Sequence, residues 1–214
     1  MVEHGKNKSM NIFDNKTIFL IKNLFFFILL LTSFNCTISE YDYDIIFDKN
    51  NNSFKNADIP LEGLVYKKYG ESKIEVGYLE NGEKNGKWLL RYPNKEKKEQ
   101  TTYYNGMKNG LSVKWYLNGL RKVQGEFLNG DPNGLYSEWF NNGQKSVIGV
   151  FKKGVEHGPS TRWYRNGNKM QQGSFLNGKR NGEWTWWYKD GKIKKTGIYK
   201  DGIFTLEQKW AKNL

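Results

Sequence analysis

Aromatic and polar residues alternate in short runs along most of this chain, and the runs are separated by Asn-Gly or similar doublets. Alternation of this kind predicts half-buried strands, and Asn-Gly between two such runs is a strong signal for a hairpin. The pattern starts again every 24 residues, at Gly77, Thr101, Gly125, Gly149, Gly173 and Gly197. A repeat of this length is typical of stacked arrays, in which each unit is buried against its neighbours. The sequence therefore predicts an all-β fold, an elongated single-layer antiparallel β-meander of 24-residue hairpin repeats.

The doublets that follow the aromatic pairs are predicted to form two-residue type I′ turns, because both central residues of that turn need positive φ. These doublets are Asn118-Gly119, Asn142-Gly143, Asn166-Gly167 and Asp190-Gly191. The other connection in each unit is expected to be longer, as in Asn129–Gly134. Counting outward from a two-residue turn pairs Trp184 with Gly197 and Ser160 with Gly173. We therefore expect the Trp184 ring to lie against Gly197, and Gly173 to meet only a serine.

Successive side chains of a strand point to opposite faces of the sheet, so the aromatic residues divide into two sets. The predicted core face collects Trp88, Tyr136, Trp184, Tyr92, Tyr116, Phe140, Tyr164, Tyr188, Tyr103, Phe127, Phe151, Phe175 and Tyr199. The other face receives the candidate binding surface, which consists of Trp115, Trp139, Trp163 and Trp187. One interpretation is that these indoles pack against charged stems such as Lys122 or Lys194. The other is a ladder that stacks on a sugar, a base or a peptide of a partner.

The first 36 residues have the order of a secretory signal, with Lys16 and Lys22 before the apolar run Leu24–Leu31 and a short polar exit to Cys36. The run is shorter than the roughly 20 residues that a membrane-spanning helix needs. The segment resembles a bacterial lipoprotein signal, although Ser33 and Asn35 replace the usual aliphatic and small residues. This resemblance implies lipidation of Cys36 and a membrane-anchored lipoprotein of the bacterial cell envelope, periplasmic or surface-facing. Simple secretion and a buried or uncleaved segment are the alternatives.

The chain therefore divides into five predicted segments. They are a signal segment with a lipobox-like end over 1–36, a flexible tether over 37–62, a degraded capping half-repeat over 63–76, the repeat array over 77–204 and a C-terminal tail over 205–214. The tether is predicted from its Asn- and Asp-rich composition. Whether translation starts at Met1 or Met10 stays open.

Composition and charge narrow the choice of partners. The chain has 214 residues, 16% of them aromatic, with 23 glycines and a formal net charge of +12. This excess of positive charge favours an anionic partner, which is a lipid membrane surface, nucleic acid or an acidic protein. The lysines are scattered through turns and strands, which does not favour nucleic acid and also fits a solvated face. The oligomeric state stays open.

Catalytic and metal-binding motifs are absent from the sequence. The two histidines are His4 and His157, and His157 occupies a turn position before a glycine. The single cysteine allows no intramolecular disulfide, and the spacings typical of zinc, thiol and serine-hydrolase sites do not occur. We therefore expect no catalytic residue, no metal and no cofactor, and a protein that is not an enzyme.

The repeat unit resembles the MORN-type repeat, and more closely the variant repeats of YwqK-family antitoxins. The matching elements are aromatic-x-Asn-Gly-x-x-Asn-Gly at Phe127–Gly134 and Phe175–Gly182, and Trp-aromatic-x-Asn-Gly at Trp115–Gly119, Trp139–Gly143 and Trp163–Gly167. The resemblance covers residues 77–204 and implies a twisted β-meander used for protein or lipid association. The predicted function is a non-enzymatic, envelope-tethered binding or scaffold protein. The alternative is an antitoxin-like protein that occludes a toxin partner.

Overall fold

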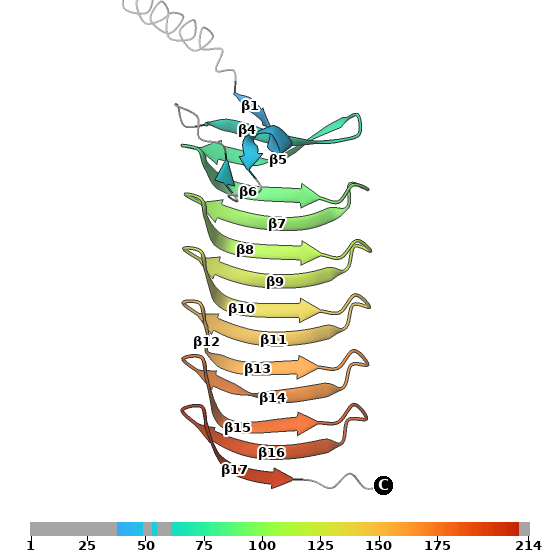
Figure 1. Cartoon of the computed structure of the whole chain (residues 1–214), viewed down its shortest axis with the longest axis vertical. Coiled ribbons are helices and arrows are strands. Elements are labelled where there is room, and N and C mark those ends of the chain that lie inside the picture. Colours follow the sequence, from blue (N-terminus) through green and yellow to red (C-terminus); the bar gives the residue numbers. More distant parts are fainter. Residues whose placement is uncertain (1–37, 49–52, 55–60, 210–214) are drawn as a thin grey trace, which may run out of the picture. The chain divides into compact units, whose positions relative to one another are not determined.

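Short strands joined by tight turns lie side by side throughout the part of the chain that the structure describes (Figure 1). The computed structural model describes residues 38–48, 53–54 and 61–209. The described residues from Ser39 onward belong to one compact unit, and its main element is a 15-stranded sheet. The single-layer antiparallel β-meander expected from the repeat pattern is confirmed. Among the described residues, no helix has the length and apolar character that crossing a membrane requires.

The strands of the sheet follow the order of the chain, with two exceptions. β1 (Glu40–Asp42) pairs in parallel with β4 (Gly63–Tyr69), and β12 (Val155–Glu156) pairs only with β11 (Lys145–Lys152). The remaining strands are β5 (Ser72–Glu80), β6 (Glu83–Arg91), β7 (Lys97–Tyr104), β8 (Met107–Trp115), β9 (Arg121–Leu128), β10 (Asp131–Trp139), β13 (Gly158–Trp163), β14 (Lys169–Leu176), β15 (Lys179–Trp187), β16 (Ile193–Lys200) and β17 (Ile203–Lys209). A separate small sheet contains β2 (Phe47–Asp48) and β3 (Ser53–Phe54).

The two-residue turns lie at the margin where the sequence predicted the longer connection. Leu128 pairs with Asp131, and the two residues between them, Asn129 and Gly130, have φ of 50° and 91°. The same turn recurs at Asn81-Gly82, Asn105-Gly106, Lys153-Gly154, Asn177-Gly178 and Asp201-Gly202. Positive φ at both central positions is the mark of a type I′ turn, and the strand simply continues beyond it. The second doublet of each motif, such as Asn133-Gly134, lies inside the strand at a break in register.

The predicted type I′ assignment of Asn118-Gly119 and its equivalents was therefore wrong. In this loop Gly119 has positive φ and Asn118 does not. Tyr116 N–H donates to Leu120 O, and Gly119 N–H donates to Tyr116 O. This is the pattern of a three-residue loop in which a type I turn is followed by a left-handed residue. The extra residue shifts the register next to the loop, so Ile193 pairs with Trp187 and not with the Tyr188 that a two-residue count requires.

Asparagine is needed in these loops for its side chain and not for positive φ. Asn118 Oδ1 accepts a hydrogen bond from Leu120 N–H at 3.2 Å, which closes its own turn. Asn118 Nδ2 donates to Asn141 O of the next loop at 2.9 Å. Asn142 and Asn166 repeat both contacts one and two units further on. The amide side chain therefore stabilises its own loop and also ties it to the following one.

Large rings on one face are buried against glycine on the neighbouring strand. Trp184 pairs with Gly197 and Ser160 with Gly173, as counted from the sequence. However, the Trp184 ring leans over Gly173, where an added Cβ would lie 2.3 Å from the ring carbons. Trp88 covers Gly77 in the same way, also at 2.3 Å. The expectation that Gly173 meets only a serine was wrong. Counting residues across one hairpin gives the partner of Trp184, but it does not say which of the two neighbouring strands the Trp184 ring covers.

The described part of the predicted tether packs against the first strands. α2 (Tyr43–Ile46) follows β1, and Tyr43 joins Val65, Leu79 and Trp88 in one hydrophobic cluster. Ion pairs of Lys67 with Asp44 and of Lys73 with Glu40 add contacts across the same end of the sheet. Residues 39–48, which lie in the segment predicted as a tether, thus form folded structure. At the other end β17 continues to Lys209, beyond the boundary at 204 predicted for the array.

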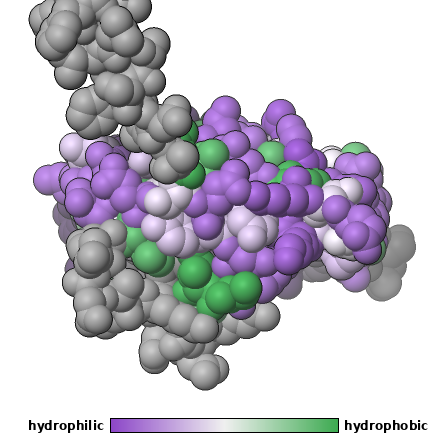
Figure 2. All heavy atoms as spheres, turned by 90° about the horizontal axis from the view of Figure 1, so that it is seen from above, coloured by the Kyte–Doolittle hydropathy of each residue, from purple (hydrophilic) through white to green (hydrophobic). Residues whose placement is uncertain are grey.

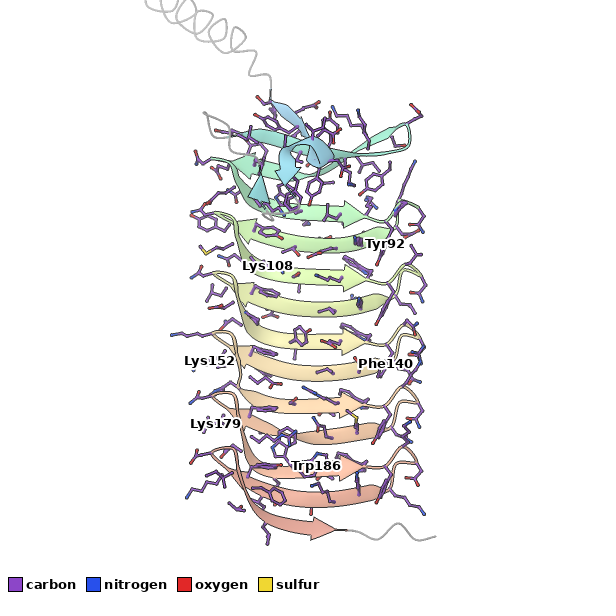
Figure 3. All side chains as sticks on the ribbon, viewed as in Figure 1. Tyr92, Lys108, Phe140, Lys152, Lys179 and Trp186 are labelled. Carbon is purple, nitrogen blue, oxygen red and sulfur yellow. The ribbon has the colours of Figure 1, made fainter. Side chains whose placement is uncertain are left out.

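Tyrosine hydroxyls link successive units through the sheet backbone. Tyr92 Oη donates to Trp115 O and Tyr116 Oη donates to Trp139 O, both at 2.8 Å. Tyr164 Oη donates to Trp187 O at 2.9 Å. The equivalent position in the third unit is Phe140, which has no hydroxyl to offer Trp163 O. Figure 3 labels Tyr92 and Phe140 on this same margin.

The ring-over-glycine packing predicts a difference between two glycine substitutions. Gly173→Val should lower the free energy of unfolding by about 1–3 kcal/mol more than Gly149→Val, since overpacking costs that much. The Trp184 ring occupies the space over Gly173, whereas a Cβ on Gly149 would be 3.8 Å from its nearest neighbour, Ser160 Oγ. Guanidinium denaturation followed by circular dichroism measures both values. Equal losses for the two variants would contradict the packing.

The tyrosine ladder predicts opposite effects at two equivalent positions. Tyr116→Phe should destabilise the protein by about 1 kcal/mol, the usual net contribution of one hydrogen bond. Phe140→Tyr should leave stability unchanged or raise it by up to a similar amount, because Trp163 O can accept the new hydroxyl. The same denaturation experiment tests both, and a stable Tyr116→Phe variant would show that the ladder contributes nothing.

Candidate functional site

The four tryptophans predicted as a binding surface are half-buried along one margin of the sheet. Trp115, Trp139, Trp163 and Trp187 each stand at the end of a strand, next to the aromatic residue that opens the loop. Lys97 Nζ lies 5.7 Å from the centre of the Trp115 ring, and Lys169 Nζ lies 5.5 Å from that of Trp187. Lysines therefore lie over two of these indoles. Use of this row as a contact surface stays a prediction.

Lys122 and Lys194, which we expected to pack against the tryptophans, lie over other rings. Lys122 Nζ lies 5.5 Å from the centre of the Tyr116 ring, and Lys194 Nζ lies 5.7 Å from that of Tyr188. Each lysine thus covers the tyrosine next to a tryptophan and not the tryptophan itself. The reason is the register shift beside the loop, which the two-residue count did not include.

A second row of exposed apolar side chains flanks the type I′ turns on the opposite margin. We call this row, together with its lysines, the turn margin. Its apolar members are Tyr104, Met107, Leu128, Val155, Leu176 and Ile203, with exposed fractions between 43% and 70%. Its basic members are Lys152, Lys153, Lys179 and Lys200, all exposed. Figure 3 labels Lys152 and Lys179 there.

Sequence reasoning missed the turn margin because it placed the tight turns at the wrong doublets. The available signal was that the doublets at 105–106, 129–130, 153–154, 177–178 and 201–202 each have at least one apolar residue directly beside them, whereas those at 142–143, 166–167 and 190–191 have none. Viewed from the end that carries β1, the described surface is mostly hydrophilic and its apolar residues form a few groups (Figure 2). Exposed apolar side chains in a repeated row are the kind of surface that contacts a partner.

The ring face of the sheet carries cations directly over aromatic rings. Lys84 Nζ lies 5.0 Å from the Trp88 ring centre and 5.1 Å from that of Tyr103. Burial lowers the pKa of the Lys84 ammonium, an effect that Glu99 opposes. Burial also raises the pKa of Tyr103, to which Glu99 adds. The rings and cations of this face thus form partly dehydrated pairs.

Two cavities on the ring face are lined by aromatic and charged side chains. Trp88, Tyr136 and Trp184 alternate along the array with Ser112 and Ser160, both buried. The first cavity, of about 720 Å³, lies beside the α2 segment and is lined by Tyr43, Trp88, Glu99, Tyr103, Lys108 and Lys114 among others. Lys114 Nζ lies 3.5 Å from Glu99 Oε2 in this cavity. Burial raises the pKa of Tyr43 to about 12, so this phenol is neutral at physiological pH.

The second cavity, of about 460 Å³, lies in the middle of the array. Its lining includes Tyr136, Glu138, Phe151, Glu156 and Arg162. Tyr136 Oη donates a hydrogen bond to Glu138 Oε1. Burial, and then this contact with a carboxylate, raise the pKa of Tyr136 well above its ordinary value. The cavity therefore combines neutral rings with carboxylates.

The remaining predicted residues do not form a further site. His157 is half-buried between β12 and β13, and its Nδ1 lies 3.3 Å from Asn177 Oδ1 across neighbouring turns. Within the ranges that the structure covers, no group of three or more His, Cys, Asp or Glu side chains could hold a metal ion. Cys36 and His4 lie outside the described residues.

Comparison with known proteins agrees with the repeat geometry. The family described as MORN repeat variant matches residues 156–177 and 180–201. The first match spans β12 to β14, and the second spans β15 and β16. No curated protein matches the chain. Residues 156–201 therefore carry the MORN repeat variant, and MORN repeats suggest a repeat-based binding or scaffold role.

Proposed function

We propose that this protein is a non-enzymatic scaffold, tethered to the bacterial cell envelope by a lipidated Cys36, whose repeat sheet binds an anionic membrane surface or a protein. The turn margin is the observation that carries the proposal. It presents exposed apolar side chains and lysines on one edge of a long, regular sheet. Such a surface can insert side chains into an interface while its ammonium groups meet lipid headgroups or carboxylates.

The repeat makes weak contacts add up along the sheet. Each turn of the margin offers one or two apolar side chains, of which Ile203 at 70% and Tyr104 at 58% are the most exposed. Lysines near an anionic surface contribute about 1 kcal/mol each, so several turns acting together produce useful affinity. The formal net charge of +12 acts in the same direction. A rigid row of equivalent contacts is what a scaffold needs to hold a partner in register.

The proposed lipid anchor is supported by the sequence of the first 36 residues. A basic start, a short apolar run and a cysteine after a polar exit are the features that support lipidation. Acyl chains contribute about 0.8 kcal/mol per buried methylene group, and two chains together keep a protein on a membrane. An anchored array would meet the membrane surface at high local concentration, which lowers the affinity that each turn must supply.

Lipidation predicts incorporation of labelled palmitate into the full chain when it is expressed in bacteria. The label should be lost with Cys36→Ser, because Cys36 is the only cysteine. Membrane fractionation should show the same change, with wild type in the membrane pellet and the variant released. Equal labelling of the two chains would refute the lipid anchor at Cys36.

The turn margin predicts binding to vesicles that contain anionic lipid. With residues 39–214, the double variant Leu128→Ser with Leu176→Ser should weaken binding at least roughly tenfold, since each leucine loses about 1 kcal/mol or more of burial. The matched control is Leu117→Ser with Leu120→Ser on the opposite margin, where the leucines are 59% and 41% exposed.

Co-sedimentation with anionic and with neutral vesicles measures these affinities. We expect the control variant to bind like wild type, and added salt to weaken both. If the two double variants bind equally, the turn margin is not the contact surface. If wild type binds no vesicles at all, the partner is a protein.

A further inference from the structure

We infer that the cavity lined by Tyr136 and Phe151 binds an alkylammonium group, such as the side chain of a lysine on a partner polypeptide. The site lies on the ring face and does not depend on the anchor or on membrane binding. The reasoning starts from the positions that the chain's own cations take on the same face.

Two ring pairs of this face hold a cation supplied by the chain itself. Lys84 lies over both Trp88 and Tyr103, at 5.0 and 5.1 Å from their ring centres. Arg180 lies over Trp184 and Tyr199, with its guanidinium carbon 4.4 and 5.4 Å from their centres. These distances are within the range of about 6 Å at which a ring attracts a cation. In both units the cation stands four residues before the first ring of the pair.

The third ring pair has the same geometry but a different residue at the cation position. Tyr136 and Phe151 are packed edge to face with centroids 5.5 Å apart. Four residues before Tyr136 stands Pro132, which is uncharged. Its register is equivalent, because Pro132 pairs with Phe127 as Arg180 pairs with Phe175. In the described part of the chain, no lysine or arginine lies over Tyr136 or Phe151.

The space beside this ring pair is large enough for a ligand side chain. The cavity measures about 460 Å³, and binding cavities range from about 300 to 1,000 Å³. Gly149 belongs to the lining and contributes no side chain to fill the space. An added Cβ on Gly149 would still be 3.8 Å from Ser160 Oγ. The chain thus leaves an open space beside a ring pair over which it places no cation of its own.

The charges of the lining select a cation. Glu138 and Glu156 line the cavity together with Arg162, so the charged side chains sum to −1 on a chain whose formal net charge is +12. Among the described residues, neither glutamate forms an ion pair with a lysine or arginine. Glu138 accepts the hydroxyl of Tyr136 and keeps further acceptor capacity. Two ring faces and two carboxylates around one space provide what an ammonium group on an apolar stem requires.

The test titrates the full chain, purified in mild detergent, with n-butylammonium chloride and with a capped lysine peptide. The neutral counterparts are n-butanol and the same peptide with an acetylated lysine. Ring signals of Tyr136 and Phe151, followed by nuclear magnetic resonance, should shift with the two cations only. Tighter binding of the peptide would assign the site to a lysine of a polypeptide, and equal binding would assign it to small amines.

Pro132→Lys supplies the missing cation from the chain itself. This variant should weaken binding of n-butylammonium at least roughly tenfold, because a tethered ammonium competes for the same rings. The matched control Pro132→Gln has a long polar side chain without charge and should bind like wild type. Circular dichroism checks that both variants keep the sheet.

Arg162→Gln provides a second test of the site in a variant that keeps Pro132. It removes a positive charge from the lining, so the affinity for n-butylammonium should rise several-fold. Glu156→Gln should lower that affinity. The inference is overturned if n-butanol shifts the same signals as n-butylammonium, if wild type binds neither cation, or if Pro132→Lys binds as well as Pro132→Gln.

Discussion

A sheet of one layer has no second layer to cover its side chains, and this constraint governs the whole protein. The rings of Trp88 and Trp184 are buried along the sheet, each against a glycine of the neighbouring strand. Each ring also has a cation over it, Lys84 over Trp88 and Arg180 over Trp184. Glycine at the start of a unit is thus a packing residue, because a Cβ there would occupy the place of the ring. Burial comes from the neighbouring units, as expected for a stacked array.

The two margins of the sheet differ in their turns and in the side chains that they expose. On one margin, type I′ turns reverse the chain in two residues and leave apolar and basic side chains exposed. On the other, longer loops are tied together by Asn118 and its equivalents and by the hydroxyls of Tyr92, Tyr116 and Tyr164. One margin is therefore cross-linked by hydrogen bonds while the other offers contact groups. This division supports a scaffold that is stiff along one side and binds along the other.

Variation between the units gives the array its local differences. The alternation of Trp88, Ser112, Tyr136, Ser160 and Trp184 changes how well each step of the ring face is filled. Pro132 and Glu156 stand where other units have Lys84, Lys108 or Arg180, and the charged side chains that line the central cavity sum to −1 on an otherwise basic chain. In a single layer, one substitution in the repeat is enough to open a cavity, since no opposite layer can fill it.

The sequence by itself determined the architecture, because a 24-residue period with alternating rings and Asn-Gly doublets permits little except a meander of hairpins. It also determined the hairpin partners of Trp184 and Ser160, since the positions along each strand follow from counting. Only the tertiary structure decided which doublet forms the tight turn, because Asn-Gly suits a type I′ turn and a type I turn followed by a left-handed glycine equally well. It likewise decided that the Trp184 ring leans over Gly173 and that residues 39–48 pack on the first strands. Both arrangements depend on the space between neighbouring segments of the chain, and the residue pattern along one strand carries no information about that space.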